Sequence, residues 1–208
     1  MWLATTATSV AARAGLLFLA LQRVAAQESC SVVDTSGATL TASHTNSVNI
    51  NEDYQRAFDS DTSTKWLVYE AVSEPVWIEV ELSAATAVTK YAITSGDDAS
   101  ERDPASWGLA GSNDGVYYVA LDEQVGALWD ARLEQQLFSL DNVNSYTHYR
   151  FTFNSVRDMD VANSLQLTSI SLYEGDCEDP CCGVDCGDHG SCNNGVCECD
   201  SGYEGSDC

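Results

Sequence analysis

"RDPASWGLAGSNDG" (residues 102–115) is the stretch whose pattern most directly indicates the fold. Trp107 and Leu109 are two positions apart, and such alternation is typical of a strand with one face in the core. SNDG (112–115) follows, and these residues favour the positive φ values of a tight hairpin. The stretch therefore predicts a strand that buries Trp107 and Leu109 and ends in a tight turn.

The other residues of this stretch are predicted to hold the fold and not to touch a ligand. Arg102 and Asp103, directly before Pro104, are expected to pair and hold a loop in place. Gly111 and Gly115 are expected to supply the backbone freedom that turns require.

Alternation of the same kind recurs on both sides. In WIEVEL (77–82) and HYRFTF (148–153), every second residue is large and apolar, which predicts strands with one buried face. Further strands are predicted at 89–94, 106–112, 117–123, 132–140 and 165–173. No stretch shows sustained helical periodicity with caps. Seven or more short strands in about 145 residues predict an all-β sandwich, because each strand needs an opposing sheet to cover its apolar face.

A family resemblance rests on five segments that occur in a fixed order: AFDSDTSTKW (57–66), WIEVEL (77–82), YAITSGDDASERDPASWGLAGSNDG (91–115), YRFTF (149–153) and LQLTSISLY (165–173). Together they resemble the discoidin, or coagulation-factor type C, domain, most of all its carbohydrate-binding versions attached to bacterial glycosidases. The resemblance covers nearly all of 31–174. It implies a galactose-binding-like jelly roll of two antiparallel sheets, with ligand-carrying loops at one end.

The N-terminal residues 1–26 are typical of a secretory signal peptide. Arg13 precedes the apolar segment 14–21, which is too short to span a bilayer, and small residues stand at 24–26. The alternative is a first helix of the fold. Since no later stretch is apolar for long enough to form a membrane helix, we expect a secreted, extracellular protein in which disulfides persist.

The chain is strongly acidic, with a formal net charge of −23. Removal of 1–26 would take away Arg13 and Arg23 and no acid, which leaves seven basic against 32 acidic residues and a charge of −25. Such a field repels nucleic acid and anionic lipid and suits cations or neutral ligands. A simpler interpretation is solubility in a salty medium.

The cysteines divide the chain into two domains. Residues 31–174 contain no cysteine, whereas 177–208 contain eight of the nine. We therefore predict a sandwich domain over 27–176 and a second domain over 177–208. From Cys182 the spacing C-x3-C-x5-C-x4-C-x-C-x8-C resembles the short EGF-like repeats of tenascins and teneurins. A unit this small needs covalent or metal cross-links to be stable, because it cannot bury an adequate hydrophobic core.

Spacing alone leaves fifteen pairings of these six cysteines open, and a zinc site is the alternative to disulfides. The EGF-like resemblance implies the pairs Cys182–Cys192, Cys186–Cys197 and Cys199–Cys208. Type C relatives often join their two ends, which implies Cys30–Cys177. Cys181 is then the odd residue: it is free, joins a second chain in a covalent dimer, or pairs beyond the end, and it could exchange roles with Cys177.

The DSDTST turn invites a metal-site interpretation. An EF-hand is rejected, because Thr64 stands where that loop needs glycine. In the resembled family this turn often holds one structural Ca²⁺, which implies Asp59, Asp61 and Thr64 as ligands. Ser169 stands where the family adds a glutamate. The alternative is an Asx-type turn held by its own side chains.

A sugar site needs an aromatic ring and a few fixed polar groups. Six residues are candidate sugar ligands by their position in predicted loops: Trp66, Tyr69, His44, Asn154, Arg157 and Asn163. Asn46 lies in the same loop as His44 and is a further candidate. Trp66 matches a family position that is usually core, and the asparagines also suit turns. The loops are mostly polar and acidic, which argues against docking to an anionic membrane.

Nothing in the sequence indicates catalysis. The three histidines stand in no recognisable catalytic motif, and there is no GxSxG, HExxH or phosphate-binding glycine loop. The sequence therefore predicts a secreted recognition and adhesion protein that binds a glycan or glycoprotein through a discoidin-like jelly roll, with an EGF-like spacer. The alternative is a structural, protein-binding adhesion or matrix module with no sugar site.

Overall fold

The computed structural model describes residues 30–46, 49–175, 186–187, 189–193, 196–203 and 205. The predicted signal segment, 1–26, lies outside the described residues. Four cysteines also lie outside the described residues: Cys177, Cys181, Cys182 and Cys208. Three of the four predicted disulfides and the predicted covalent dimer involve these cysteines.

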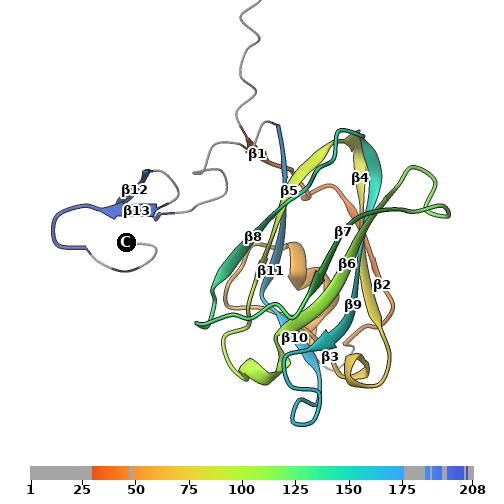
Figure 1. The fold of residues 1–208 in the computed structure, drawn as a ribbon, viewed down its shortest axis with the longest axis horizontal. Helices are drawn as coiled ribbons and strands as arrows, with labels where there is room; N and C mark the ends of the chain where they lie inside the picture. Colours follow the sequence, from red (N-terminus) through yellow and green to blue (C-terminus); the bar gives the residue numbers. More distant parts are fainter. Residues whose placement is uncertain are drawn as a thin grey trace, which may run out of the picture.

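Most of the described chain forms two antiparallel sheets that face each other (Figure 1). One sheet has the strand order β2 (Thr39–Ala42), β4 (Val76–Thr86), β9 (Tyr146–Val156), β6 (Pro104–Ser112) and β7 (Val119–Val125). The other has the order β1 (Ser31–Val32), β11 (Ser169–Glu174), β5 (Val88–Thr94) and β8 (Gln135–Ser139). The predicted all-β sandwich is therefore confirmed.

A separate short ladder joins β3 (Trp66–Val68) to β10 (Leu165–Leu167) at the lower end of the view in Figure 1. The stretch 165–173, predicted as one strand, is divided at Thr168. The Thr168 hydroxyl donates to the Ser95 carbonyl at 2.9 Å, which turns the chain from β10 into β11.

The helices of the described chain are all short 3-10 turns, as the lack of helical periodicity predicts: η1 (Ile50–Glu52), η2 (Tyr54–Phe58), η3 (Tyr69–Val72) and η4 (Ser100–Arg102). Across the described residues, no helix has the length and apolar character needed to cross a membrane. Three of these turns, η1, η2 and η3, flank β3 in sequence.

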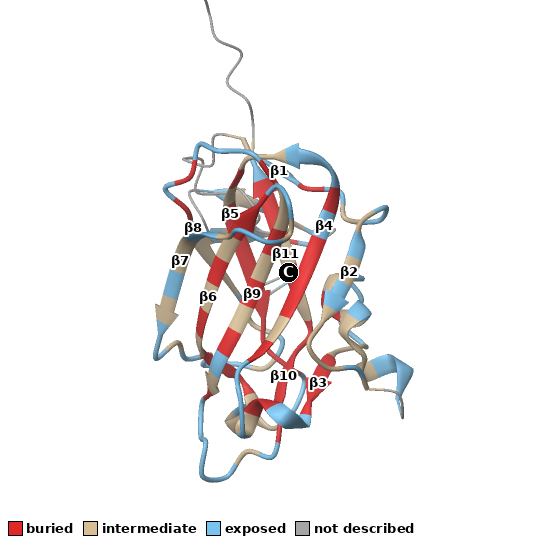
Figure 2. Ribbon diagram, turned by 90° about the vertical axis from the view of Figure 1, so that its right-hand side faces the viewer, coloured by how far each residue is buried: buried red, intermediate tan, exposed pale blue. Residues whose placement is uncertain are grey.

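The core lies between the two sheets, and the alternation of the sequence explains it (Figure 2). Phe151 of β9 pairs with Ile78 of β4 on one side and with Leu109 of β6 on the other. All three side chains are buried. Burial of each such side chain contributes about 1.5–3 kcal/mol to the free energy of unfolding. The alternation predicted for 77–82, 106–112 and 148–153 is thus confirmed.

Trp107 links the two sheets through polar and ring contacts. Its Nε1 donates to the Tyr91 hydroxyl at 2.9 Å, and that hydroxyl donates to Asp122 Oδ2 at 2.6 Å. Burial, together with the bond to Asp122, raises the pKa of Tyr91. The ring of Phe138 meets the indole edge-on at 5.2 Å between centroids. The indole N–H is therefore satisfied inside the core, as buried tryptophans require.

The turn after β6 is wider than predicted. Ser112 ends β6 and Val119 begins β7, so that residues 113–118 form the connection. The Ser112 hydroxyl accepts hydrogen bonds from the amides of Asp114 and Gly115 at 3.2 and 3.0 Å. Only Gly115 in this connection has a positive φ, at 67°. The predicted tight hairpin is wrong, because this side-chain cap stabilises a wider loop.

Two further predictions for residues 102–115 are corrected. Gly111 lies inside β6 and supplies no turn. An added Cβ there would lie 2.5 Å from the ring of Tyr146, so the glycine permits close packing. Asp103 does not pair with Arg102. Its buried carboxylate faces the connection between β7 and β8, from which Arg132 reaches it.

The C-terminal described residues form a small hairpin of β12 (Gly190–Asn193) and β13 (Val196–Cys199). A disulfide joins Cys186 to Cys197, one of the pairs that the EGF-like resemblance implies. Three further cysteines are disulfide-bonded: Cys30, Cys192 and Cys199. Their predicted partners lie outside the described residues. The rings of His189 and Tyr203 stack at 3.8 Å between centroids.

Candidate functional site

Two adjacent hollows open among the loops that flank β3. The first has a volume of about 310 Å³. Its apolar part consists of Leu67, Val68 and Tyr69. Its polar part consists of Thr45, Asn46, Asn49, Glu52 and Glu70. An apolar surface with a few convergent polar groups is the usual composition of a small-molecule site.

Tyr69 is the exposed aromatic residue of this hollow. β3 is buried throughout its three residues, and Tyr69 follows directly as the first residue of η3. The change from strand to 3-10 turn brings the ring out of the core, where 56% of the residue is exposed. Leu67 and Val68 remain buried beside it. The end of β3 thus supplies an aromatic surface at the molecular exterior.

The opposite wall is held by short asparagine and aspartate hydrogen bonds. Asp53 Oδ1 accepts from the amides of Asn46 and Tyr54 at 2.8 and 2.9 Å. Asn46 Oδ1 accepts from the Asn49 amide at 3.2 Å, and Asn49 Oδ1 accepts from the Asn51 amide at 3.1 Å. These are the local side-chain bonds that favour turns and caps over regular strands. They position the polar groups of the hollow.

The second hollow, of about 240 Å³, shares Asn49 and Glu52 with the first. Its other lining residues are almost entirely polar: Asn51, Ser63, Thr64, Lys65 and Asp97. The Lys65 ammonium donates to Asp97 at 2.8 Å and to Asp98 at 2.9 Å. Burial alone would lower the pKa of Lys65, but these two hydrogen bonds raise it. The bond from Lys65 also lowers the pKa of Asp98.

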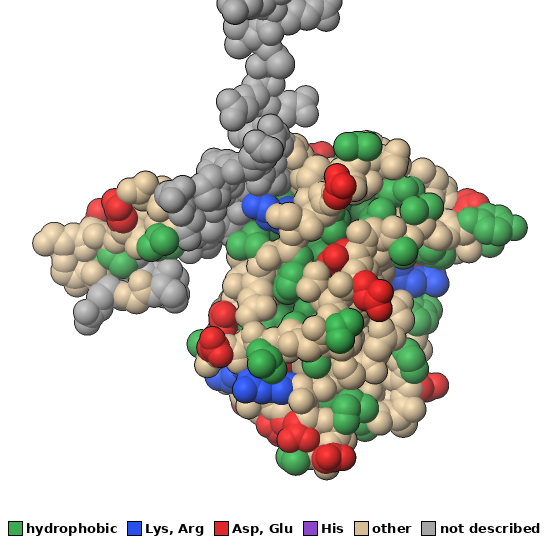
Figure 3. Space-filling model, in the orientation of Figure 1, with side chains coloured by type: hydrophobic (Ala, Val, Ile, Leu, Met, Phe, Trp, Pro, Cys, Tyr) green, Lys and Arg blue, Asp and Glu red, His purple; other side chains and the backbone are tan. Residues whose placement is uncertain are grey.

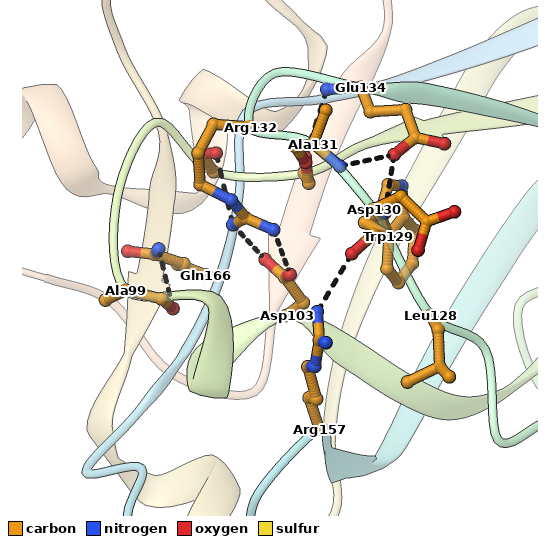
Figure 4. A network of polar contacts seen from close by, with 12 residues as sticks. Ala99, Asp103, Leu128, Trp129, Asp130, Ala131, Arg132, Glu134, Arg157 and Gln166 are labelled. Atoms are coloured by element: carbon orange, nitrogen blue, oxygen red, sulfur yellow. Dashed lines mark hydrogen bonds and ion pairs between the residues drawn. The ribbon is translucent and has the colours of Figure 1, made fainter.

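A polar network fixes the segment that carries Asp97 and Asp98, and Figure 4 shows its Arg132–Asp103 pair. Arg132 binds the carboxylate of Asp103 through both terminal nitrogens, at 2.7 and 2.5 Å. Arg132 also donates to the Asp98 carbonyl at 3.2 Å. Gln166 Nε2 donates to the same carbonyl at 2.6 Å. Asp103 is therefore a positioning group for the wall of the second hollow.

The predicted calcium turn lies beside the second hollow and contributes Thr64 to it. Thr64 Oγ1 lies 2.9 Å from Asp59 Oδ2 and 3.0 Å from the Asp61 carbonyl oxygen. Asp61 Oδ1 accepts from Ser63, both amide and hydroxyl. Arg56 Nη1 lies 3.3 Å from Asp59 Oδ2. Oxygen donors of the kind that Ca²⁺ prefers thus converge, in a turn that its own side chains also close.

Ser169 stands at the position where the resembled family has an additional glutamate. Ser169 Oγ donates to Thr94 Oγ1 at 2.9 Å. Within the described residues, no group of three or more His, Cys, Asp or Glu side chains could hold a metal. A bound Ca²⁺ would therefore depend on Asp59, Asp61, Thr64 and backbone oxygens, and would displace Arg56 from Asp59. Calcium binding stays a prediction.

Of the six predicted ligand residues, Tyr69 lies in a hollow, together with the neighbouring candidate Asn46. Trp66 as a ligand residue is wrong. It has no exposed surface and packs edge-on against Phe153 at 5.8 Å between centroids. His44 lines neither hollow. Its Nδ1 lies 3.0 Å from Ser43 Oγ and its Nε2 lies 3.4 Å from Glu74.

The remaining three candidates are exposed and line neither hollow. Arg157 donates to the Trp129 carbonyl at 2.8 Å, which joins two loops (Figure 4). Asn163 Oδ1 accepts from the Ser164 hydroxyl at 3.1 Å. Asn154 lies near the end of β9. The structure thus gives Arg157 a role in holding loops and does not bring these three residues to Tyr69.

Sequence reasoning missed most of the polar lining. The asparagine-rich run at 46–51 offered a local signal for Asn49 and Glu52, because such runs favour closely bonded turns. Lys65 and Asp97 offered none. They are 32 residues apart and meet only when the β5–β6 connection folds against the end of the DSDTST turn.

Comparison with known proteins finds no family model that matches the chain. A peptide-N(4)-(N-acetyl-β-glucosaminyl)asparagine amidase from Arabidopsis thaliana is 33% identical over 121 residues, which is 56% of this chain and 17% of the amidase. The chain thus corresponds to a small part of the length of that curated relative.

Two solved structures match this chain over nearly all of their own length. A family 32 carbohydrate-binding module from Clostridium perfringens, in complex with GalNAc-β-1,3-galactose, has a TM-score of 0.58 and 19% identity, and covers 68% of this chain and 99% of the module. An F5/8 type C domain from Bacteroides fragilis has a TM-score of 0.59 and 16% identity, and covers 70% and 97%. The sandwich of this protein therefore has the galactose-binding-like jelly-roll fold of carbohydrate-binding and type C discoidin-like domains.

Proposed function

We propose that the protein recognises glycans and binds a sugar residue in the first hollow, with Tyr69 as the stacking surface. The observation that carries the proposal is the exposed ring of Tyr69 beside amide and carboxylate groups in one hollow of about 310 Å³. A sugar ring has a face of C–H groups and an edge of hydroxyls. An aromatic surface covers the former, and fixed polar side chains bind the latter.

The comparisons support this proposal by analogy. One solved neighbour with this fold is named as a carbohydrate-binding module and holds a GalNAc-galactose disaccharide. The amidase relative is named for a bond between N-acetylglucosamine and asparagine. Both names concern N-acetylated hexosamines, which makes glycans and glycoproteins with such sugars the proposed ligands. We propose that this chain binds them and does not cleave them.

The test is a glycan array followed by calorimetric titration of the sugar that binds most strongly. Tyr69→Ala should weaken binding by more than about tenfold, which corresponds to about 1.4 kcal/mol. Tyr117→Ala is the matched control, because Tyr117 is 80% exposed and lines neither hollow. An array without any bound glycan, or equal affinity of Tyr69→Ala and wild type, would refute the proposal.

Secretion and an EGF-like spacer belong to the same proposal. The predicted signal peptide supports secretion, and so do the disulfide-bonded cysteines, because disulfides persist in oxidising compartments. The Cys186–Cys197 bond supports the EGF-like assignment of the second domain. Expression with a native N-terminus in a secreting host should place the protein in the medium, with residues 1–26 removed.

A single Ca²⁺ at Asp59, Asp61 and Thr64 is proposed as a stabilising ion. Millimolar Ca²⁺ should raise the melting temperature of the wild type, because an ion bound only by the folded state stabilises it. Asp61→Asn should abolish this rise, since it removes one of the two carboxylates. An unchanged melting temperature of the wild type at millimolar Ca²⁺ would rule out the site.

A further inference from the structure

We infer that the two hollows form one groove that accepts two linked sugar residues, and that the carboxylates of this groove select neutral over acidic sugars. The inference rests on the proposed function and adds to it the length and the charge class of the ligand. It follows from the shared wall, from the different linings of the two hollows and from the charges in them.

The shared wall makes the two hollows neighbours. Asn49 and Glu52 line both of them. Asn49 caps η1 by accepting from the Asn51 amide, and Asn51 itself lines the second hollow. The Asn51 carbonyl accepts from the Lys65 amide at 3.1 Å, which ties η1 to the far wall. A ligand bound across Asn49 and Glu52 would therefore contact both hollows.

The linings differ in a way that suits two successive sugars. The first hollow offers the ring of Tyr69 and the apolar groups of Leu67 and Val68. The second offers amide, hydroxyl, ammonium and carboxylate groups and little apolar surface. A sugar that stacks in the first hollow would direct its linked neighbour, which is held by hydroxyl contacts alone, toward the second.

The charges of the groove are predominantly negative. Glu52, Glu70 and Asp97 line it, and Lys65 is the basic residue among its described lining. The Lys65 ammonium is already bound by Asp97 and by Asp98. The carboxylate of an acidic sugar would thus approach like charges, which costs binding energy, whereas hydroxyls and acetamido groups find acceptors and donors.

Acidic side chains also occur on the wider surface of the molecule (Figure 3). Acidic side chains are scattered over the face shown, and several gather toward its lower end. The net charge of −23 extends the same repulsion to any anionic glycan that approaches.

The experiment is a calorimetric titration with five probes. They are galactose, GalNAc-β-1,3-galactose, N-acetylglucosamine, its β-1,4-linked disaccharide, and a disaccharide in which glucuronic acid replaces one neutral sugar. In at least one neutral series, the disaccharide should bind about tenfold or more tightly than its monosaccharide. The acidic disaccharide should bind about tenfold or more weakly than the neutral one at low salt. This difference should shrink at high salt, because screening shortens the range of the repulsion.

Two variants separate the parts of the inference. Asn51→Ala should remove the advantage of the disaccharide, and Asn144→Ala, an exposed asparagine that lines neither hollow, is its control. Glu52→Gln should reduce the discrimination against the acidic disaccharide severalfold, and Glu123→Gln, on the exposed side of β7, is its control. Thermal melts should show that all four variants remain folded.

The outcomes distinguish this inference from the proposed function. If no probe and no array glycan binds, or if Tyr69→Ala has no effect, the proposed function fails. If a monosaccharide binds in a Tyr69-dependent way and the disaccharide gains nothing, the proposed function stands and the two-sugar groove is overturned. Equal affinity for acidic and neutral disaccharides would overturn the charge selection.

Discussion

Among single residues, the buried carboxylate of Asp103 is the one whose loss should destabilise the fold most. It has no exposed surface, and Arg132 binds it through two nitrogens. Burial raises the pKa of Asp103, and the hydrogen bonds from Arg132 oppose this rise. A buried charge is tolerated only when it is paired and hydrogen-bonded. The pair holds the β7–β8 connection against the loop that lines the second hollow.

Asp103→Asn should lower the free energy of unfolding by about 3 kcal/mol, because it breaks a buried pair by removing one charge. Urea denaturation measures this loss. Asp130→Asn is the control. Its side chain is exposed in the same region, and the change should stay within about 0.5 kcal/mol. Similar losses in both variants would contradict the assigned role of Asp103.

Gly111 is the second residue whose identity the packing requires. Gly111→Ala would place a Cβ 2.5 Å from the ring of Tyr146. Overpacking of this kind should cost about 1–3 kcal/mol. Gly108 lies on the same strand, and its nearest contact for a Cβ would be 3.7 Å away, so that Gly108→Ala should be tolerated. Thermal unfolding of the two variants makes the comparison, and equal melting temperatures would contradict the packing argument.

Among the contacts between elements, the decisive one joins the end of the DSDTST turn (59–64) to the β5–β6 connection. The two segments meet through the ion pairs of Lys65 with Asp97 and Asp98. Both aspartates are more than half exposed, so the energy of each pair is modest. The contact matters more for the position of the groove wall than for the stability of the sandwich.

The pH dependence of stability should reveal this contact. The pKa of Asp98 is lowered in the folded state from its ordinary value of 3.8. Its stabilising contribution is therefore present above pH 3.8 and lost as the pH falls through the lowered value. Lys65→Met should remove this contribution and flatten that part of the profile. Melting temperatures between pH 2 and 6 test it, and parallel profiles for both proteins would contradict it.

At the scale of the whole molecule, the sandwich and the C-terminal hairpin rely on different stabilising forces. The sandwich has a large apolar core between two sheets. The hairpin of β12 and β13 has no buried residue in these two strands and is joined to Cys186 by the Cys186–Cys197 bond. Closing a loop of 11 residues contributes about 3 kcal/mol in the chain-entropy model, which a small unit cannot replace by packing.

Reduction should therefore affect the two parts differently. In dithiothreitol, the segment 186–203 should become sensitive to limited proteolysis, while the sandwich strands remain protected. Mass spectrometry of the fragments over time measures this, with the oxidised protein as the control. Equal rates of cleavage in both parts would show that the core does not hold the sandwich by itself.

The sandwich follows from the pattern of the amino acids alone. Strict alternation in 77–82, 106–112 and 148–153 allows only one face of each strand to be buried, and two such faces must cover each other. The sequence also placed Tyr69 in an exposed loop, from its position after the DSDTST turn. It placed Trp66 among the ligand residues by the same argument, since position in a loop does not reveal burial.

Which polar side chains share a site, in contrast, depends on the folding of the loops. Lys65 and Asp97, or Asp103 and Arg132, come from connections far apart in the chain. Their pairing depends on how the loops at one end of the sandwich fold against each other. The two-residue alternation of apolar and polar residues shows which face of a strand is buried. Loops have no comparable pattern that would show which of their side chains meet. The jelly roll could therefore be predicted from the sequence, and the two-part groove beside Tyr69 could not.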